Sequence, residues 1–156
     1  MTDEFILSAD IEYRFPLDRF YYLNEAMHVW ALPLGDNLFR IGIDQFGAKF
    51  IGEIIFINIK KINSTVKQTK TFAKLESGKK PISLASPFSG TLKEHNSALK
   101  DNPNLIGEDP YGEGWIVCIE ANNVDEESAH IEIYDIGDKE GIQNFMAEEA
   151  KRYGLI

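Results

Sequence analysis

The chain has 156 residues, a hydrophobic fraction of 44% and a net charge of −9, from 25 acidic and 16 basic residues. This length and composition are those of a folded domain with a core of its own, and they exclude a disordered chain. The acidic balance argues against nonspecific binding to nucleic acid or to anionic membranes, and it favours docking onto basic patches of partner proteins.

No apolar run approaches the roughly 20 residues that span a bilayer. The first residues are acidic, whereas a signal or transit peptide would be basic. The single cysteine, Cys118, lies in the apolar run WIVCIEA, where we expect a small core side chain rather than a reactive thiol. Together these features predict a cytoplasmic protein in a reducing compartment.

The N-terminal segment is rich in aromatic residues, and Asp18 predicts the cap of a short helix that runs to about Asn24. From Trp30 to Glu120 the pattern changes to that of strands. LFRIGI alternates, and KFIGEIIFINI is rich in Ile and Phe, with Gly52 predicted to mark a bend or bulge.

Further strands are predicted in TVKQTKTFAKLE, ISLASPFSGTLKE and WIVCIEA, and a turn-rich connection in NPNLIGEDPYGEG. Pro87 and Gly90 interrupt the second of these strands, which suits an edge or the corner of a small barrel. Short strands at this spacing, with Gly and Pro at the corners, predict a mainly β sandwich or barrel.

The C-terminal region predicts one more strand in SAHIEIYDI, with Ile131 and Ile133 on one face, and then a helix. Asp138 is the expected N-cap, and Gly154 can end the helix near Tyr153. We expect its apolar stripe to pack on the sheet, with partner binding as the alternative. The stripe consists of Ile142, Phe145, Met146, Ala150 and Tyr153.

The sequence lacks the usual catalytic and metal-binding motifs. It has no Cys-x-x-Cys pair, phosphate loop or Gly-x-Ser-x-Gly elbow. The histidines, His28, His95 and His130, are widely spaced, and we expect structural or exposed roles for them. The acidic pairs Glu126-Glu127 and Glu148-Glu149 are expected to lie on solvated faces.

One turn stands out, in KLESGKKPISLAS. If FAKLE and ISLAS are paired strands, Ser77, Gly78 and Lys79 form the tip of a hairpin, and Gly78 supplies a positive φ. From position alone, Lys79 is an ordinary solvated turn lysine.

A wider pattern resembles the H protein of the glycine cleavage system, from Tyr22 to about Glu120. Glu76, Ser77 and Lys79 match that family's lipoylation motif Glu-Ser-x-Lys. The other matching residues are Tyr22, His28, Trp30, Gly42, Gly52, Ile54, Ser86, Pro87, Ser89, Gly90, Asn96, Leu99, Asp101, Pro103 and the run DPYGEGW from Asp109 to Trp115.

The resemblance implies a barrel-sandwich hybrid, mainly β, with a C-terminal helix and a short N-terminal extension. It divides the chain into an extension, residues 1–21, and a lipoyl-carrying domain, residues 22–156. It also implies that lipoic acid is joined by an amide to Lys79, rather than to Lys80, and that Glu76, Ser77 and Gly78 serve recognition or the turn.

By this resemblance the protein is a non-catalytic carrier, whose arm shuttles intermediates between partner enzymes. The partners implied are glycine decarboxylase, aminomethyltransferase, dihydrolipoyl dehydrogenase and a lipoate ligase, with no nucleic acid and no membrane.

Departures from the family pattern keep two alternatives open. Gly78 stands where an apolar residue is usual, Lys80 where a small one is usual, and Val29 replaces a Glu. The Glu-Ser-Gly-Lys turn, with the Lys60-Lys61 pair upstream of it, is similar to that of H-like lipoate-binding proteins that carry sulfur for a heterodisulfide-reductase-like complex. A binding or scaffold module without lipoate is the alternative of another class.

Overall fold

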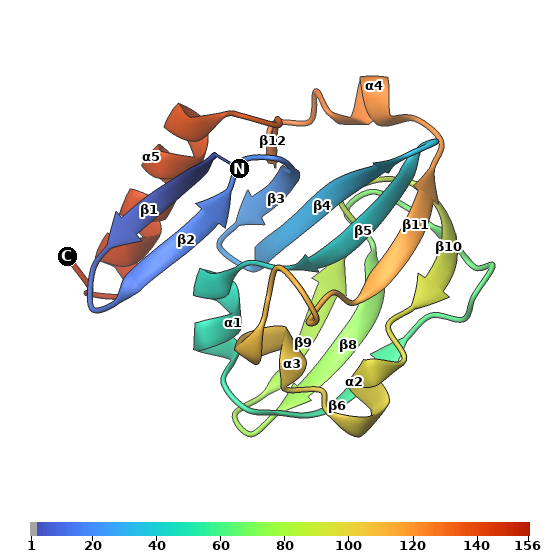
Figure 1. The fold of residues 1–156 in the computed structure, drawn as a ribbon, viewed down its shortest axis with the longest axis horizontal. Coiled ribbons are helices and arrows are strands. Elements are labelled where there is room, and N and C mark those ends of the chain that lie inside the picture. Colours follow the sequence, from blue (N-terminus) through green and yellow to red (C-terminus); the bar gives the residue numbers. More distant parts are fainter. Residues whose placement is uncertain (1–2) are drawn as a thin grey trace.

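Strands dominate the computed structural model, which describes residues 3–156 (Figure 1). The largest sheet is curled and antiparallel throughout, and has seven strands in the described chain. In spatial order these are β12 (Ile133–Tyr134), β3 (Phe20–Asn24), β4 (Met27–Gly35), β5 (Leu38–Ile43), β11 (Val117–Ala121), β10 (Gly90–His95) and β7 (Thr65–Val66).

A smaller antiparallel sheet faces this one and contains β6 (Ile54–Ile59), β8 (Thr71–Ser77) and β9 (Pro81–Ala85), with β8 in the middle. The chain passes from the small sheet to the large one between β9 and β10. Pro87 lies in this connection and Gly90 begins β10, so the predicted corner is confirmed. The mainly β fold of two facing sheets is confirmed with it.

The N-terminal residues form a separate hairpin of β1 (Glu4–Ser8) and β2 (Glu12–Pro16). Both strands alternate between exposed and buried side chains, as expected of strands with one covered face. The hairpin lies beside α5 (Lys139–Arg152), the C-terminal helix, as Figure 1 shows.

Two hydrophobic cores lie on opposite faces of the β3–β4 region, because neighbouring residues of a strand point to opposite sides. Tyr22 and Val29 belong to the core between the two sheets. Tyr21 and Trp30 point the other way, into a second core that the N-terminal hairpin and α5 cover.

The predicted C-terminal helix is confirmed. The Asp138 side chain accepts a hydrogen bond from the Gly141 backbone N–H, and Gly154 has φ of 72° after the last turn. Ile142, Met146 and Ala150 are fully buried against the second core, whereas Tyr153 is 41% exposed. The stripe therefore packs within the molecule.

The predicted helix from Asp18 to Asn24 is wrong, because these residues contain strand β3. Phe20 to Leu23 are all buried, alternately in the two cores, and β3 pairs with β4 along its whole length. Pairing and two-sided burial outweigh the capping signal of Asp18.

The predicted strand KFIGEIIFINI begins too early. Its first residues end helix α1 (Gln45–Ile51), whose N-cap Asp44 accepts a hydrogen bond from the Gly47 N–H. Gly52 marks the change of direction, as expected, with φ of 78° at the helix end. The strand β6 follows.

The remaining connections are more helical than predicted. The turn-rich segment holds α3 (Leu105–Glu108), α2 (Ala98–Asp101) lies just before it, and α4 (Val124–Glu127) follows β11. The strand expected in SAHIEIYDI shrinks to the two residues of β12. Ile133 is buried but Ile131 is 90% exposed, so they do not share a buried face.

Candidate functional site

The hairpin of β8 and β9 forms one end of the small sheet. Glu76 pairs with Pro81, so residues 77–80 make the tip. The side chain of Lys79 is exposed there, and its amine forms no ion pair or hydrogen bond with residues 3–156. An amine on such a tip is open to acylation by another protein.

Ser77 organises this tip through its hydroxyl group. The Ser77 Oγ accepts hydrogen bonds from the backbone N–H groups of Lys79, at 3.2 Å, and Lys80, at 3.1 Å. It donates to the Lys80 carbonyl at 2.8 Å. The predicted positive φ of Gly78 is wrong, because Gly78 is not among the left-handed residues. The serine side chain closes the turn without it.

Residues 52–54, at the start of β6, lie against the tip. The Gly78 N–H donates to the Glu53 carbonyl at 3.2 Å, and Ile54 pairs with Ser77. A Cβ added to Gly52 would lie 4.0 Å from the Lys79 Cε, so the lysine stem runs close to this glycine. The sequence pattern marks Gly52 as a bend, but no pattern indicates that the Lys79 stem lies near it.

The four predicted site residues therefore meet at one tip. Glu76 is exposed on the outer face of the sheet, Ser77 is buried, and Gly78, Lys79 and Lys80 are exposed. Their roles in lipoylation stay predictions.

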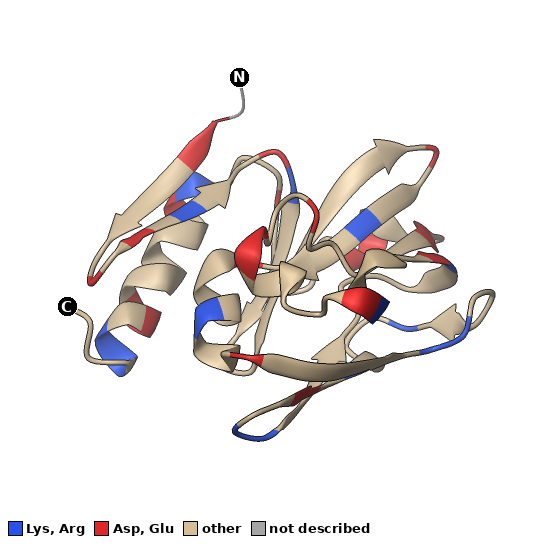
Figure 2. Ribbon diagram, turned by 60° about the horizontal axis from the view of Figure 1, so that its bottom comes forward, with Lys and Arg blue, Asp and Glu red and all other residues tan. Residues whose placement is uncertain are grey.

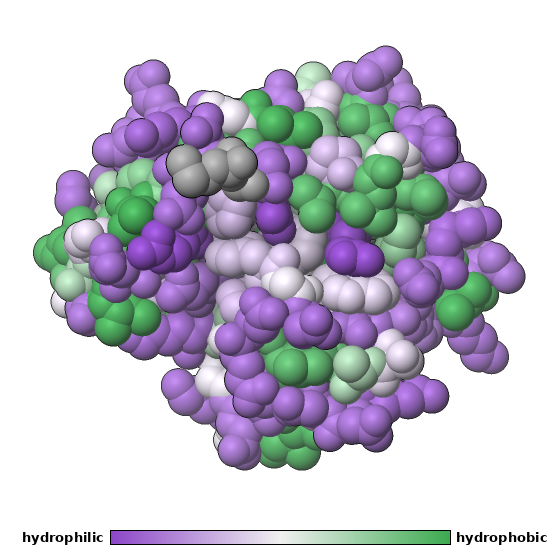
Figure 3. Space-filling model, viewed as in Figure 1, coloured by the Kyte–Doolittle hydropathy of each residue, from purple (hydrophilic) through white to green (hydrophobic). Residues whose placement is uncertain are grey.

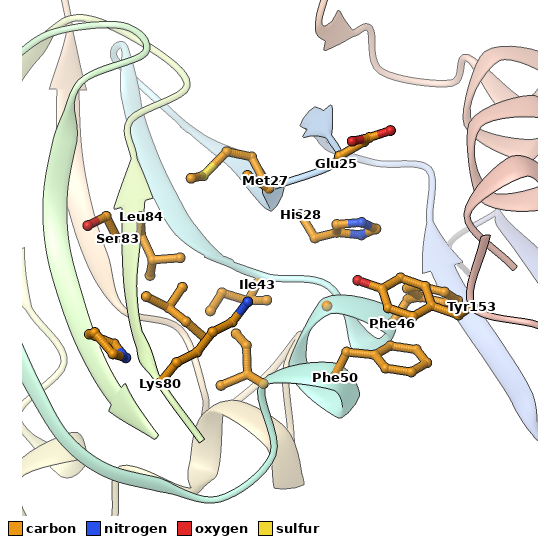
Figure 4. Close-up of a pocket in the computed structure, with 15 residues that line it drawn as sticks. Glu25, Met27, His28, Ile43, Phe46, Phe50, Lys80, Ser83, Leu84 and Tyr153 are labelled. Carbon is orange, nitrogen blue, oxygen red and sulfur yellow. The ribbon is translucent and has the colours of Figure 1, made fainter. Parts of the chain in front are cut away.

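An open cleft of about 380 Å³ runs between the hairpin and the elements β4 and α1 (Figure 4). Lys80 extends into it from the hairpin side, and Met27 and His28 lie opposite. Most of the lining is apolar, and includes Ile43, Phe46, Phe50, Ile51, Ile82, Leu84 and Tyr153. No sequence pattern predicts this cleft, because its walls come from four distant segments.

His28 lies at one end of the cleft in a buried network of charges. Its Nδ1 lies 3.0 Å from the Asp44 carboxylate and its Nε2 lies 2.8 Å from the Glu149 carboxylate. Burial alone would lower the pKa of His28, but Asp44 and Glu149 outweigh it and raise the pKa to about 9. The imidazolium is the expected form at neutral pH, and both ring N–H groups then donate.

The expectation that Glu148-Glu149 lies on a solvated face is wrong for Glu149, which is 3% exposed. Arg152 donates to its second oxygen at 2.7 Å. Burial would raise the pKa of Glu149, yet the hydrogen bonds from His28 and Arg152 lower it. In the other predicted pair, the Glu127 carboxylate accepts hydrogen bonds from the backbone N–H and the hydroxyl of Ser89, so Glu127 also has a structural partner.

Several other motif residues serve the scaffold. The Asn96 amide donates to the carbonyls of Glu113 and Trp115, both at 2.7 Å. Gly42 lies against Trp30, where an added Cβ would come within 2.2 Å of the indole. Such residues hold the fold around the hairpin rather than act at its tip.

The remaining candidate residues fit structural roles. Cys118 is buried, and burial raises the pKa of its thiol.

Within residues 3–156 no group of three or more His, Cys, Asp or Glu side chains is placed to hold a metal ion. The part of the chain that the structure describes also contains no helix with the length and apolarity that a bilayer crossing needs.

The tip fits a lipoyl group on chemical grounds. The group is joined through an amide, which requires an accessible amine, and its hydrocarbon chain suits an apolar surface. Lys79 provides the amine, and the cleft beside it provides the apolar surface.

Comparison with known proteins points to one family. The family model described as "Glycine cleavage H-protein" matches residues 20–139. The glycine cleavage system H protein of Coprothermobacter proteolyticus is 41% identical over 97 residues, which are 62% of this chain and 76% of that protein. That of Thermus thermophilus is 31% identical over 135 residues, covering 86% of this chain and 98% of the relative.

A solved structure agrees with these sequences. The glycine cleavage system H protein of Mycobacterium marinum superposes with a TM-score of 0.66 at 27% identity. The match covers 83% of this chain and 99% of that one.

Proposed function

The chain belongs to the glycine cleavage H-protein family, whose members are lipoate carriers, and we propose from this premise that it is lipoylated at Lys79. The observation that carries the proposal is the tip itself. Ser77 fixes the backbone of Lys79 and Lys80 by hydrogen bonds, while the Lys79 amine stays exposed.

Attachment would form an amide between the Lys79 Nζ and the carboxyl carbon of activated lipoate. The ammonium first gives up one proton, and the free amine then attacks and loses a second proton as the activating group leaves, so the positive charge of the side chain disappears. Once bound, the lipoyl group would supply two sulfur atoms that alternate between a disulfide and a dithiol.

The residues of this chain would position that arm rather than react. Ser77 holds the tip, Gly52 leaves room beside the lysine stem, and the apolar cleft would receive the hydrocarbon chain. A fixed tip with a flexible arm gives a high effective concentration at each docked enzyme. We therefore propose a non-catalytic carrier component.

The proposed partners are glycine decarboxylase, aminomethyltransferase and dihydrolipoyl dehydrogenase, with a lipoate ligase for attachment. The names of the relatives support this role, since they are glycine cleavage system proteins. We propose the cytoplasm as the compartment, which fits the unpaired Cys118.

Transport of sulfur is the second candidate function, and Lys80 favours it. Its side chain lines the cleft beside Lys79, where a positive charge would repel a cationic aminomethyl cargo. Glycine decarboxylase should load methylamine onto the lipoylated protein if it serves glycine cleavage. Poor loading, together with modification by a sulfur donor, would favour sulfur transport.

Substitution of the two adjacent lysines tests the attachment site. Co-expression with a lipoate ligase should add one lipoyl group to the wild-type protein and to Lys80→Arg, but none to Lys79→Arg. Intact mass and peptide mass spectrometry measure the result. Full modification of Lys79→Arg would refute the assignment.

A further inference from the structure

The outer face of the small sheet is uncovered and carries exposed apolar side chains. Ile55 is 63% exposed and Phe56 is 57% exposed, both on the edge strand β6. Figure 3 shows that green, apolar atoms form small islands within a mostly purple surface, one of them at the lower end of the molecule, where Figure 1 places β6 and the hairpin. Adjacent exposed apolar side chains can mark a site of protein–protein contact, whereas single ones are ordinary.

The register of the sheet places this apolar pair next to the tip. Ile54 pairs with Ser77 and Phe56 pairs with Glu76, with an irregularity between them at Ile55. The pair therefore lies one strand away from the residues that lead into Lys79. A protein that covers the Lys79 amine also reaches Phe56.

The sequence segment that contains β6 and the hairpin is positively charged in an otherwise acidic chain. Residues 51–100 contain nine Lys and three Glu, a net charge of +6, whereas the rest carries seven basic and 22 acidic residues, a net charge of −15. Figure 2 shows blue at the hairpin tip and, at the opposite end of the small sheet, along the loop that follows β6. Three of these lysines, Lys60, Lys61 and Lys74, are exposed on or just after the sheet.

We propose that the outer face of the small sheet, with Ile55 and Phe56 near the tip, Lys74 further along β8, and Lys60 and Lys61 beyond the far end of β6, forms the docking surface for the lipoate ligase. The complementary face of the ligase is an acidic rim around an apolar recess that takes Phe56. This inference rests on the proposed attachment at Lys79, and it adds the surface through which the attaching enzyme recognises the chain.

The ligase is the occupant that the geometry favours. A bare lysine reaches only the length of its four-carbon stem, so the ligase must approach the tip closely. Enzymes that act on the loaded arm can stay further away. An anionic membrane or nucleic acid would be repelled by the −15 charge of the rest of the chain.

The test measures ligation of the full-length protein by the lipoate ligase of the same organism, with lipoate and ATP. The double variant Ile55→Thr/Phe56→Thr removes the apolar pair but keeps strand propensity. We expect KM for the protein to rise about tenfold, equivalent to about 1.4 kcal/mol, with kcat nearly unchanged. Lys60→Gln/Lys61→Gln/Lys74→Gln should also raise KM and weaken its dependence on salt.

Matched controls come from the opposite part of the molecule. Ile131→Thr removes a side chain that is 90% exposed, and Lys151→Gln removes an exposed charge, so both should keep the wild-type KM. Circular dichroism and the unfolding midpoint confirm that each variant is folded.

The possible outcomes separate the two proposals. Normal ligation of the wild type with KM unchanged in both surface variants would overturn the docking surface alone. Absence of ligation in the wild type would overturn the attachment proposal and the docking surface together. Binding of the unmodified protein to vesicles with 30% phosphatidylserine, abolished by the lysine variant, would identify a membrane surface instead.

Discussion

At the scale of single residues, the hydroxyl of Ser77 does more for the hairpin tip than the neighbouring glycine. It is a buried group that makes three hydrogen bonds, two accepted from backbone N–H groups and one donated to a carbonyl. These bonds replace the ones that Lys79 and Lys80 would otherwise make to water. The serine of the Glu-Ser-x-Lys motif thus has a structural role, closing the turn, that is independent of enzyme recognition.

Removal of this hydroxyl should loosen the tip. In Ser77→Ala the two N–H groups lose their acceptor, so we expect the free energy of unfolding to fall by about 1 kcal/mol. The backbone amides of Lys79 and Lys80 should exchange with solvent faster in hydrogen-exchange NMR. Ser77→Thr keeps the hydroxyl and serves as the control. Unchanged exchange at both amides in Ser77→Ala would show that the turn does not depend on Ser77.

At the scale of elements, one buried network of charges ties α5 to the rest of the fold. His28 comes from β4, Asp44 caps α1, and Glu149 and Arg152 come from the last turns of α5. Asp44 also accepts the Gly47 N–H, so the same carboxylate serves a helix cap and the ion pair. Protonated His28 therefore links α5, through Glu149, to β4 and to the cap of α1.

This network predicts that stability falls as the pH becomes alkaline. The pKa of His28 is about 9 in the folded protein, above its ordinary value of 6.5, so protonated His28 favours the folded state. Protonated His28 adds about 3 kcal/mol to the free energy of unfolding, as judged from the size of the pKa shift. This stabilisation is complete below pH 6.5 and disappears as the pH rises through 9.

Comparison with His28→Gln isolates this effect from other titrations. Urea unfolding at several values between pH 6 and pH 10 should show a steeper loss for the wild type than for the variant. Glu149 has the opposite pH dependence, because its pKa is lowered in the folded protein. The stability that ionised Glu149 adds is present above pH 4.5 and is lost in acid. Parallel pH profiles for wild type and variant between pH 6 and pH 10 would contradict the prediction.

The same elements show how far the sequence alone could lead. α5 was predictable because its cap, Asp138, and its apolar stripe are local signals. The hairpin was predictable from two apolar runs around a polar turn. The strand β3 was not, because Asp18 resembles a helix cap and only pairing with β4 decides the structure. Nothing local marks Glu149 as buried, since its partner His28 lies 121 residues away.

At the scale of the whole molecule, the large sheet is shared by two cores. Along β3 and β4, Tyr22 and Val29 face the core between the sheets, and Tyr21 and Trp30 face the core under α5. The family match runs from residue 20 to residue 139, so the N-terminal hairpin and nearly all of α5 lie outside it. These outer segments pack together over one face of the matched part.

Because the cores share strands, a defect in the second core should weaken the whole protein. Met146 of α5 is fully buried in the second core, so Met146→Ala should lower the free energy of unfolding by about 2–5 kcal/mol. Unfolding should remain a single transition, and hydrogen-exchange protection should fall in β5 and β11, which line the first core, as well as in α5. The control Glu148→Ala changes an exposed residue of the same helix and should shift stability by no more than about 0.5 kcal/mol. Two separate transitions in Met146→Ala, with protection of β5 and β11 intact, would show instead that α5 and the N-terminal hairpin are an independent covering.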